Sequence, residues 1–107
     1  MSARIALLAL LLLGSAACSA TCAQAACRED LVATAQDLDR SRSAVASAAP
    51  GSPAQCAALR QHVATLHKIR TVFARCDTGA NKDKNAAQVG AWIATFNRQI
   101  RASCKGA

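Results

Sequence analysis

Aromatic side chains are scarce in this chain of 107 residues, which contains no tyrosine, two phenylalanines and one tryptophan. Proteins that bind single-stranded nucleic acid usually stack the bases on several exposed aromatic rings. Here the spacing of Phe73, Trp92 and Phe96 places the rings at or beside the apolar faces of expected helices. The composition therefore disfavours nucleic acid as a partner. Trp92 lies at the edge of its apolar stripe, where it fits either the rim of a core or an anchor in an interface.

Motifs of catalysis and cofactor binding are also missing. The sequence has no haem-attachment Cys-x-x-Cys-His motif, no glycine-rich phosphate loop and no catalytic triad. No acid, base and nucleophile occur at a spacing that would bring them together on one element. We therefore expect a non-catalytic protein without a cofactor.

Two patterns resemble metal sites but fail on geometry. His62 and His67 are five residues apart, which separates them by about 140° around a helix, whereas the pair in a zinc helix lies within about 40°. We expect His62 to be a partly buried structural residue and His67 to be exposed. Residues 77–88 alternate polar side chains as a calcium loop does, but Lys82 replaces the required glycine and Gln88 replaces the bidentate glutamate. Neither pattern predicts a metal site.

Residues 1–25 have the composition of a cleavable secretory signal peptide. Arg4 precedes a short apolar run at 5–13, and small residues follow. The sequence Ala23-Gln24-Ala25 fits the A-x-A cleavage pattern best. We therefore expect a single mature domain of residues 26–107, in the periplasm or outside the cell.

Two other fates of the leader are open on the sequence alone. Cys18 follows small residues after the leucine run, as the lipidated cysteine of a lipoprotein does, although the residue three positions earlier is Ser15. An uncleaved anchor is the second alternative, but nine strongly apolar residues are short for a span of about 20. No later segment is apolar enough to cross a membrane.

Three segments of the expected domain have helical periodicity, at about 27–47, 53–76 and 85–104. Their apolar residues recur every three or four positions, which is typical of helices that pack on one face. Short connections make consecutive helices antiparallel neighbours. We therefore expect an all-α, up-down-up three-helix bundle. Because alanine is abundant and larger apolar residues are few, the core must be small.

Two of the expected helix starts carry capping signals. Ser52, followed by Pro53 and then by Gln55, combines an N-cap serine, a first-turn proline and a capping-box glutamine. Asn85 and Gln88 have the same capping-box spacing. These signals predict that the second helix begins at Pro53 and the third at Asn85.

Four cysteines, Cys27, Cys56, Cys76 and Cys104, lie at the ends of the expected helices. Of the three possible connectivities, an up-down-up bundle favours Cys27 with Cys76 and Cys56 with Cys104, because each pair shares one end. Cys56 and Cys76 are about 30 Å apart along one helix, against a limit of about 7 Å between bridged Cα atoms. An oxidising compartment favours bridged cysteines. We expect both disulfides to be structural.

Basic residues outnumber acidic ones, which gives the whole chain a net charge of +7. The acidic residues cluster early, with only Asp77 and Asp83 after residue 40. An excess of positive charge favours an acidic protein or an envelope component as partner, and a cationic protein on anionic lipid is the alternative. The oligomeric state is open. The candidate contact surface is formed by Arg60, Lys68, Arg98, Arg101 and Lys105.

Overall fold

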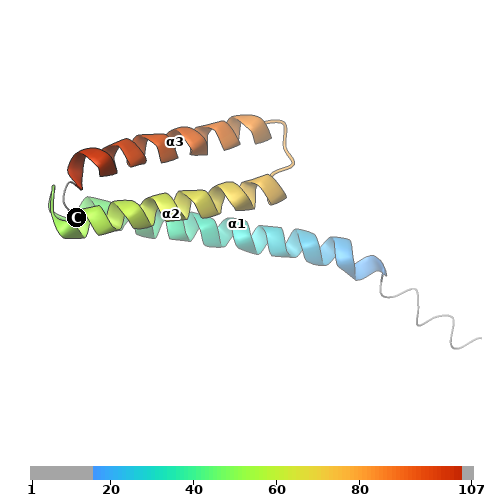
Figure 1. Ribbon diagram of the computed structural model, residues 1–107. Helices are drawn as coiled ribbons and strands as arrows, with labels where there is room; N and C mark the ends of the chain where they lie inside the picture. The colour runs from blue at the N-terminus through green and yellow to red at the C-terminus, as the bar shows by residue number, and fades with distance from the viewer. Residues whose placement is uncertain (1–15, 105–107) are drawn as a thin grey trace, which may run out of the picture.

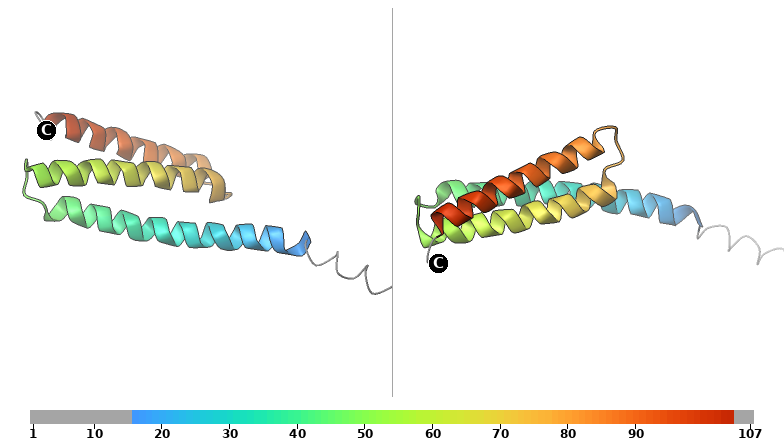
Figure 2. Two further views of the ribbon diagram at one scale, coloured as in Figure 1. Left: turned by 60° about the horizontal axis from the view of Figure 1, so that its bottom comes forward. Right: turned by 45° about the horizontal axis from the view of Figure 1, so that its top comes forward.

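The computed structural model describes residues 16–104, with side chains from residue 22 onward, and this part of the chain forms three α-helices (Figure 1). Helix α1 spans Ala16–Ser47, α2 spans Pro53–Cys76 and α3 spans Lys82–Ser103. Consecutive helices are antiparallel, and α2 lies between α1 and α3 (Figure 2). The all-α, up-down-up three-helix bundle expected from the sequence is confirmed.

Helix α2 begins as its capping signals predict. The Ser52 hydroxyl oxygen accepts a hydrogen bond from the backbone N–H of Gln55 at 3.1 Å, and Pro53 occupies the first helical position. The Gln55 side chain accepts from the backbone N–H of Gly51 at 2.8 Å. Gly51 has a φ of 73°, a conformation that glycine adopts without steric cost, so it permits the sharp turn into α2.

The other two helices begin earlier than expected. Helix α1 starts at Ala16 instead of residue 27, because the intervening segment is rich in alanine and contains no helix breaker. Helix α3 starts at Lys82, so the predicted start at Asn85 is wrong. The backbone N–H of Asn85 donates to the carbonyl of Asn81 at 2.8 Å, which places Asn85 inside the first turn. Its side chain donates to Asp77 at 3.0 Å and thus fastens the connection between α2 and α3.

The apolar core is built by α2 and α3. Leu59, Leu66 and Val89 are the largest side chains with almost no exposed surface. In the described residues, α1 contributes no fully buried apolar side chain, and its Leu38 packs against the core from the side. The main apolar cluster is therefore shared between α2 and α3. The buried apolar residues of the core are Cys56, Leu59, Val63, Leu66, Ile69, Val72, Val89 and Ile93.

Helix α1 packs on α2 through small polar residues. Thr34 and Ser41 are both buried, with exposed fractions of 4% and 6%. Their hydroxyl groups donate to carbonyls of the same helix, of Leu31 at 2.8 Å and of Leu38 at 3.1 Å, so they enter the interface without unpaired donors. Small side chains bury little apolar area, so this interface contributes less hydrophobic stabilisation than the one between α2 and α3.

Two disulfides join the helices with the predicted pairing. Cys27 is bonded to Cys76, with Cα atoms 5.4 Å apart, and Cys56 is bonded to Cys104, with Cα atoms 5.5 Å apart. The first ties α1 to α2 at one end, and the second ties α2 to α3 at the other. Two structural disulfides indicate an oxidising compartment, extracellular or periplasmic.

None of the described helices has the length and apolarity needed to cross a membrane. The apolar run at 5–13 lies outside the described residues.

Candidate functional site

Charge is divided along the long axis of the bundle. The Ser41–His62 contact shows which residues of α1 and α2 lie at the same level, and the Cys56–Cys104 disulfide does the same for α2 and α3. In this register residues 40–67 and 93–104 form one half, which we call the basic end, and residues 26–39 and 68–92 form the opposite half.

The six acidic residues of the chain all belong to the opposite half: Glu29, Asp30, Asp37, Asp39, Asp77 and Asp83. They offset an equal number of basic residues there, which are Arg28, Lys68, Arg70, Arg75, Lys82 and Lys84. The basic end contains no acidic residue, and its described basic residues are Arg40, Arg42, Arg60, Arg98 and Arg101. The net positive charge of residues 26–104 therefore resides in one half of the bundle.

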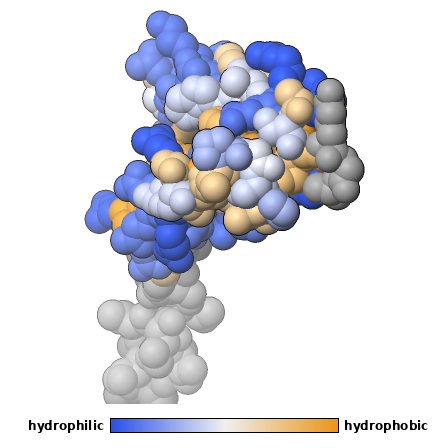
Figure 3. Space-filling view, turned by 90° about the vertical axis from the view of Figure 1, so that its left-hand side faces the viewer, coloured by the Kyte–Doolittle hydropathy of each residue, from blue (hydrophilic) through white to orange (hydrophobic). Residues whose placement is uncertain are grey.

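Figure 3 looks onto the basic end. Strongly hydrophilic side chains lie around the periphery, and the centre of the face is weakly polar to apolar. The connection between α1 and α2 reaches the surface here with small uncharged residues, among them Ala49, Pro50 and Gly51, all exposed. Strongly hydrophilic side chains thus surround a blunt tip whose exposed residues Ala49, Pro50 and Gly51 carry no charge.

Three of the predicted contact residues come together at the basic end. Arg60 follows Cys56 by one helical turn, and Arg101 precedes Cys104 by one turn. Because the disulfide holds the two cysteine Cα atoms 5.5 Å apart, Arg60 and Arg101 leave α2 and α3 at the same level. Arg98 lies one turn further along α3, and all three arginines are exposed.

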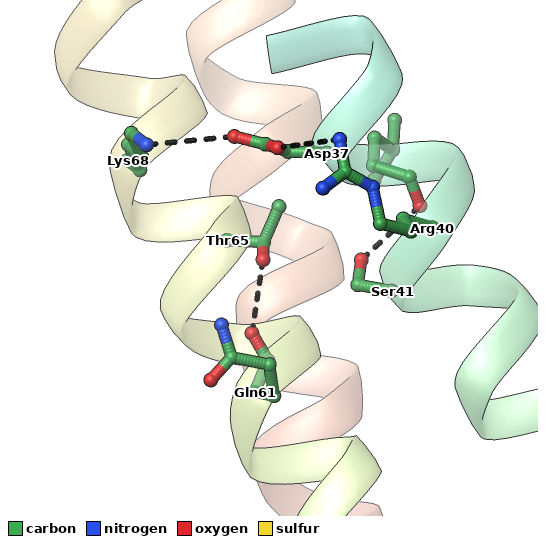
Figure 4. A network of polar contacts seen from close by, with 7 residues as sticks. Asp37, Arg40, Ser41, Gln61, Thr65 and Lys68 are labelled. Carbon is green, nitrogen blue, oxygen red and sulfur yellow. Dashed lines mark hydrogen bonds and ion pairs between the residues drawn. The ribbon is translucent and has the colours of Figure 1, made fainter. Parts of the chain in front are cut away.

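The other two predicted contact residues do not belong to this group in the described structure. Lys68 lies between α1 and α2, where its Nζ is 3.4 Å from Oδ2 of Asp37 (Figure 4). Asp37 also contacts Arg40 at 3.4 Å. Lys68 is therefore part of an ion-pair network that joins two helices. Lys105 lies outside the described residues.

Ion pairing differs between the two halves. In the opposite half Arg75 donates to Asp30 at 2.5 Å, and Lys68 pairs with Asp37. Within the described residues, neither Arg60 nor Arg101 pairs with an acidic side chain, and Arg98 donates only to Thr95 of its own helix, at 3.3 Å. The guanidinium groups of Arg60, Arg98 and Arg101 therefore keep hydrogen-bonding capacity for an external anion, whereas Arg40, at the border with the opposite half, pairs with Asp37.

A surface groove of about 540 Å³ runs between α1 and α2. Figure 4 shows the groove from outside, with α3 behind it. Its centre consists of small residues, and Asp37, Arg40 and Lys68 line its rim. These charged groups already satisfy one another, so the groove offers less unpaired charge than the basic end. The lining residues are Asp37, Arg40, Ser41, Ala44, Gln61, Ala64, Thr65 and Lys68.

The contact between Ser41 and His62 could not be found from sequence spacing. Ser41 Oγ lies 2.7 Å from His62 Nδ1, and the hydroxyl donates to the carbonyl of Leu38. With that donation in place, the imidazole supplies the hydrogen to Ser41 from Nδ1. The histidine then does not act as a base toward the serine, and the contact is a structural link between α1 and α2.

His62 also meets α3, because its ring packs edge-on against Phe96 with the ring centroids 4.5 Å apart. Its exposed fraction is 4%, which confirms the expected burial, and His67 is exposed as expected. Burial lowers the pKa of His62, and the positive charge of Arg42 lowers it further. The folded protein therefore disfavours the charged imidazole at the point where all three helices meet.

The predicted polar turn between α2 and α3 is held by Asp77. The carboxylate accepts hydrogen bonds from the Asn85 side chain at 3.0 Å and from the Gly79 backbone N–H at 3.1 Å. These two bonds lower the pKa of Asp77. In the part of the chain that the structure describes, no three histidine, cysteine or acidic side chains gather as metal ligands.

Trp92 lies on α3 with 40% of its surface exposed, close to the level of Lys68 and outside the basic end. Comparisons of the chain with protein-family models, curated proteins and solved structures found no match.

Proposed function

We propose that the protein is a small, exported, non-catalytic binding module that holds an anionic partner at its basic end. The observation that carries this proposal is that every acidic residue lies in one half of the bundle, which leaves the other half with basic residues only. A solvated helix surface ordinarily mixes charges of both signs, as the opposite half does. The basic end keeps all the excess positive charge of residues 26–104 and none of the acidic residues.

The chemistry of the basic end suits carboxylate or phosphate groups. Its described cations are all arginines, whose planar guanidinium groups donate two parallel hydrogen bonds to such anions. The Cys56–Cys104 disulfide fixes the relative level of Arg60 and Arg101, so little ordering is required when a partner binds. A rigid scaffold with unpaired arginines favours a binding role.

An oxidising compartment outside the cytoplasm is compatible with the proposed binding of an anionic partner. The disulfides indicate an oxidising environment, and the leader-like composition of residues 1–25 favours the periplasm or the cell exterior. Acidic proteins and anionic envelope components are the partners that such a surface would meet there.

Binding to poly-glutamate, a soluble polyanion, tests the proposal. The triple variant Arg60→Gln, Arg98→Gln, Arg101→Gln should bind it much more weakly than the wild type at about 50 mM salt, where surface charges are poorly screened. Isothermal titration calorimetry at two salt concentrations measures the affinity and its dependence on screening.

A matched control separates position from net charge. The variant Arg70→Gln, Lys82→Gln, Lys84→Gln removes the same charge from exposed positions in the opposite half. It should retain the wild-type affinity, and circular dichroism should show both variants folded. Equal losses in both variants, or no binding by the wild type, would refute the basic end as a binding site.

A further inference from the structure

The charges of the basic end lie close to the tip of the bundle. With a rise of about 1.5 Å per residue, Arg60 is about 10 Å from the start of α2 at Pro53. By the same measure Arg42 is about 8 Å from the end of α1, and Arg98 and Arg101 are within about 8 Å of the end of α3. All four arginines thus lie within about one Debye length of the tip at 0.1 M salt.

These arginines come from all three helices, and all of them lie near the tip. The groove between α1 and α2 lies elsewhere, and its rim is formed by Asp37, Arg40 and Lys68. A peptide or polymer strand would reach one side of such an arrangement. A flat anionic surface perpendicular to the helices would reach every side at once, because long arginine side chains extend along the bundle toward it.

The tip itself permits close approach. The exposed residues between and beside the arginines are small and uncharged, such as Ala49, Pro50 and Ala54. They bring neither acidic repulsion nor a large apolar wedge. The nearest acidic residue is Asp39 of the opposite half, about 12 Å along α1 from Ser47. That distance is somewhat more than one Debye length at 0.1 M salt, so screening weakens the repulsion of Asp39 from the surface.

From this placement of charge we infer that the anionic partner is a lipid surface, on which the bundle stands on its basic end. The inference rests on the proposed binding function and specifies its partner. Binding is peripheral and electrostatic, and the arginines contact lipid phosphates while α1, α2 and α3 project away from the membrane. Because the tip has no large apolar side chain, high salt should release the protein.

Co-sedimentation with vesicles tests the lipid partner. The protein should bind vesicles with about 30% phosphatidylglycerol in phosphatidylcholine and should not bind pure phosphatidylcholine at about 0.1 M salt. Each basic residue near such a surface changes the partition coefficient about fivefold. The variant Arg60→Gln, Arg98→Gln, Arg101→Gln should therefore bind about 100-fold more weakly, whereas Arg70→Gln, Lys82→Gln, Lys84→Gln should bind nearly as the wild type does.

Trp92, the single tryptophan, reports the orientation. It lies about 16 Å along α3 from Ser103, so an end-on bundle keeps it clear of the bilayer. Its fluorescence should be quenched equally by acrylamide with and without vesicles, and lipids brominated in the acyl chain should not quench it. Quenching by brominated lipid would overturn the end-on arrangement.

The two proposals fail in different ways. Binding to poly-glutamate without binding to anionic vesicles would overturn the lipid inference, leave the binding function in place and point to an acidic protein. Failure to bind either probe would overturn both. Equal weakening of vesicle binding by the two triple variants would show attraction by net charge alone and would also refute the inference.

Discussion

Removal of either disulfide should destabilise the protein by about the same amount. The crosslinks join residues separated by 49 and 48 positions, so each closes a loop of nearly the same length in the unfolded chain. Chain-entropy theory gives about 14 cal/mol/K for a loop of this size, or about 4 kcal/mol at 25 °C. That loss is a large part of the 5–15 kcal/mol by which an ordinary domain is stable.

The structural consequences should differ, because the two helix interfaces differ. Without Cys27–Cys76, α1 is held by small polar residues, including the contact of Ser41 with His62, by the half-buried Leu38, and by exposed ion pairs that contribute about 0–1 kcal/mol each. Without Cys56–Cys104, α3 still shares the apolar core with α2. Loss of the first disulfide should therefore release α1 before the rest of the bundle unfolds.

Paired cysteine-to-alanine variants test this expectation. Urea unfolding gives the loss of stability for Cys27→Ala with Cys76→Ala and for Cys56→Ala with Cys104→Ala. Hydrogen exchange should show selective loss of protection in α1 for the first pair. A reductant should destabilise the wild type and leave a variant that lacks both bonds unchanged. A loss below about 1 kcal/mol, or full protection of α1, would refute the reasoning.

Two further changes probe single contacts. Because the pKa of His62 is lower in the folded protein than its unfolded value of about 6.5, the unfolded chain binds more protons as the pH falls below about 6.5. The free energy of unfolding should therefore decline as the pH falls, by up to about 1.4 kcal/mol per pH unit. Urea unfolding at pH 7.5 and at pH 5 measures this decline. The variant His62→Gln should lack the part of the decline that comes from His62, whereas the control His67→Gln, at an exposed position, should retain it. The variant Ser52→Ala removes the N-cap of α2 and should lower the free energy of unfolding by about 1 kcal/mol. Thermal unfolding measures this loss, with Ser103→Ala at an exposed position as the control. An equal loss in both variants would contradict the capping role of Ser52.

The pairing of the cysteines could be predicted because helix geometry connects position in the sequence to position in space. Once three helices alternate in direction, Cys27 and Cys76 must lie at one end and Cys56 and Cys104 at the other. The start of α2 was equally predictable, since Ser52 acts on a backbone group only three residues away. These features depend on local spacing and on chain direction alone.

Other features depend on the rotation of one helix against another, which local spacing does not determine. The apolar periodicity of α1 follows Leu31 and Leu38, yet the side chains that it buries against α2 are those of Thr34 and Ser41. The contact between Ser41 and His62 depends on this rotation. Asn85 shows the same limit, because its capping-box spacing is correct but Asp77 offers its side chain a different partner.

The meaning of the charge also depends on register. From the sequence, basic residues simply outnumber acidic ones after residue 40. Antiparallel pairing brings the later part of α1, the earlier part of α2 and the last turns of α3 to one end, and these are the segments without acidic residues. The Cys56–Cys104 disulfide fixes that register for Arg60 and Arg101. The crosslink that stabilises a small core therefore also determines where the unpaired arginines gather, so stability and the proposed binding surface depend on the same bond.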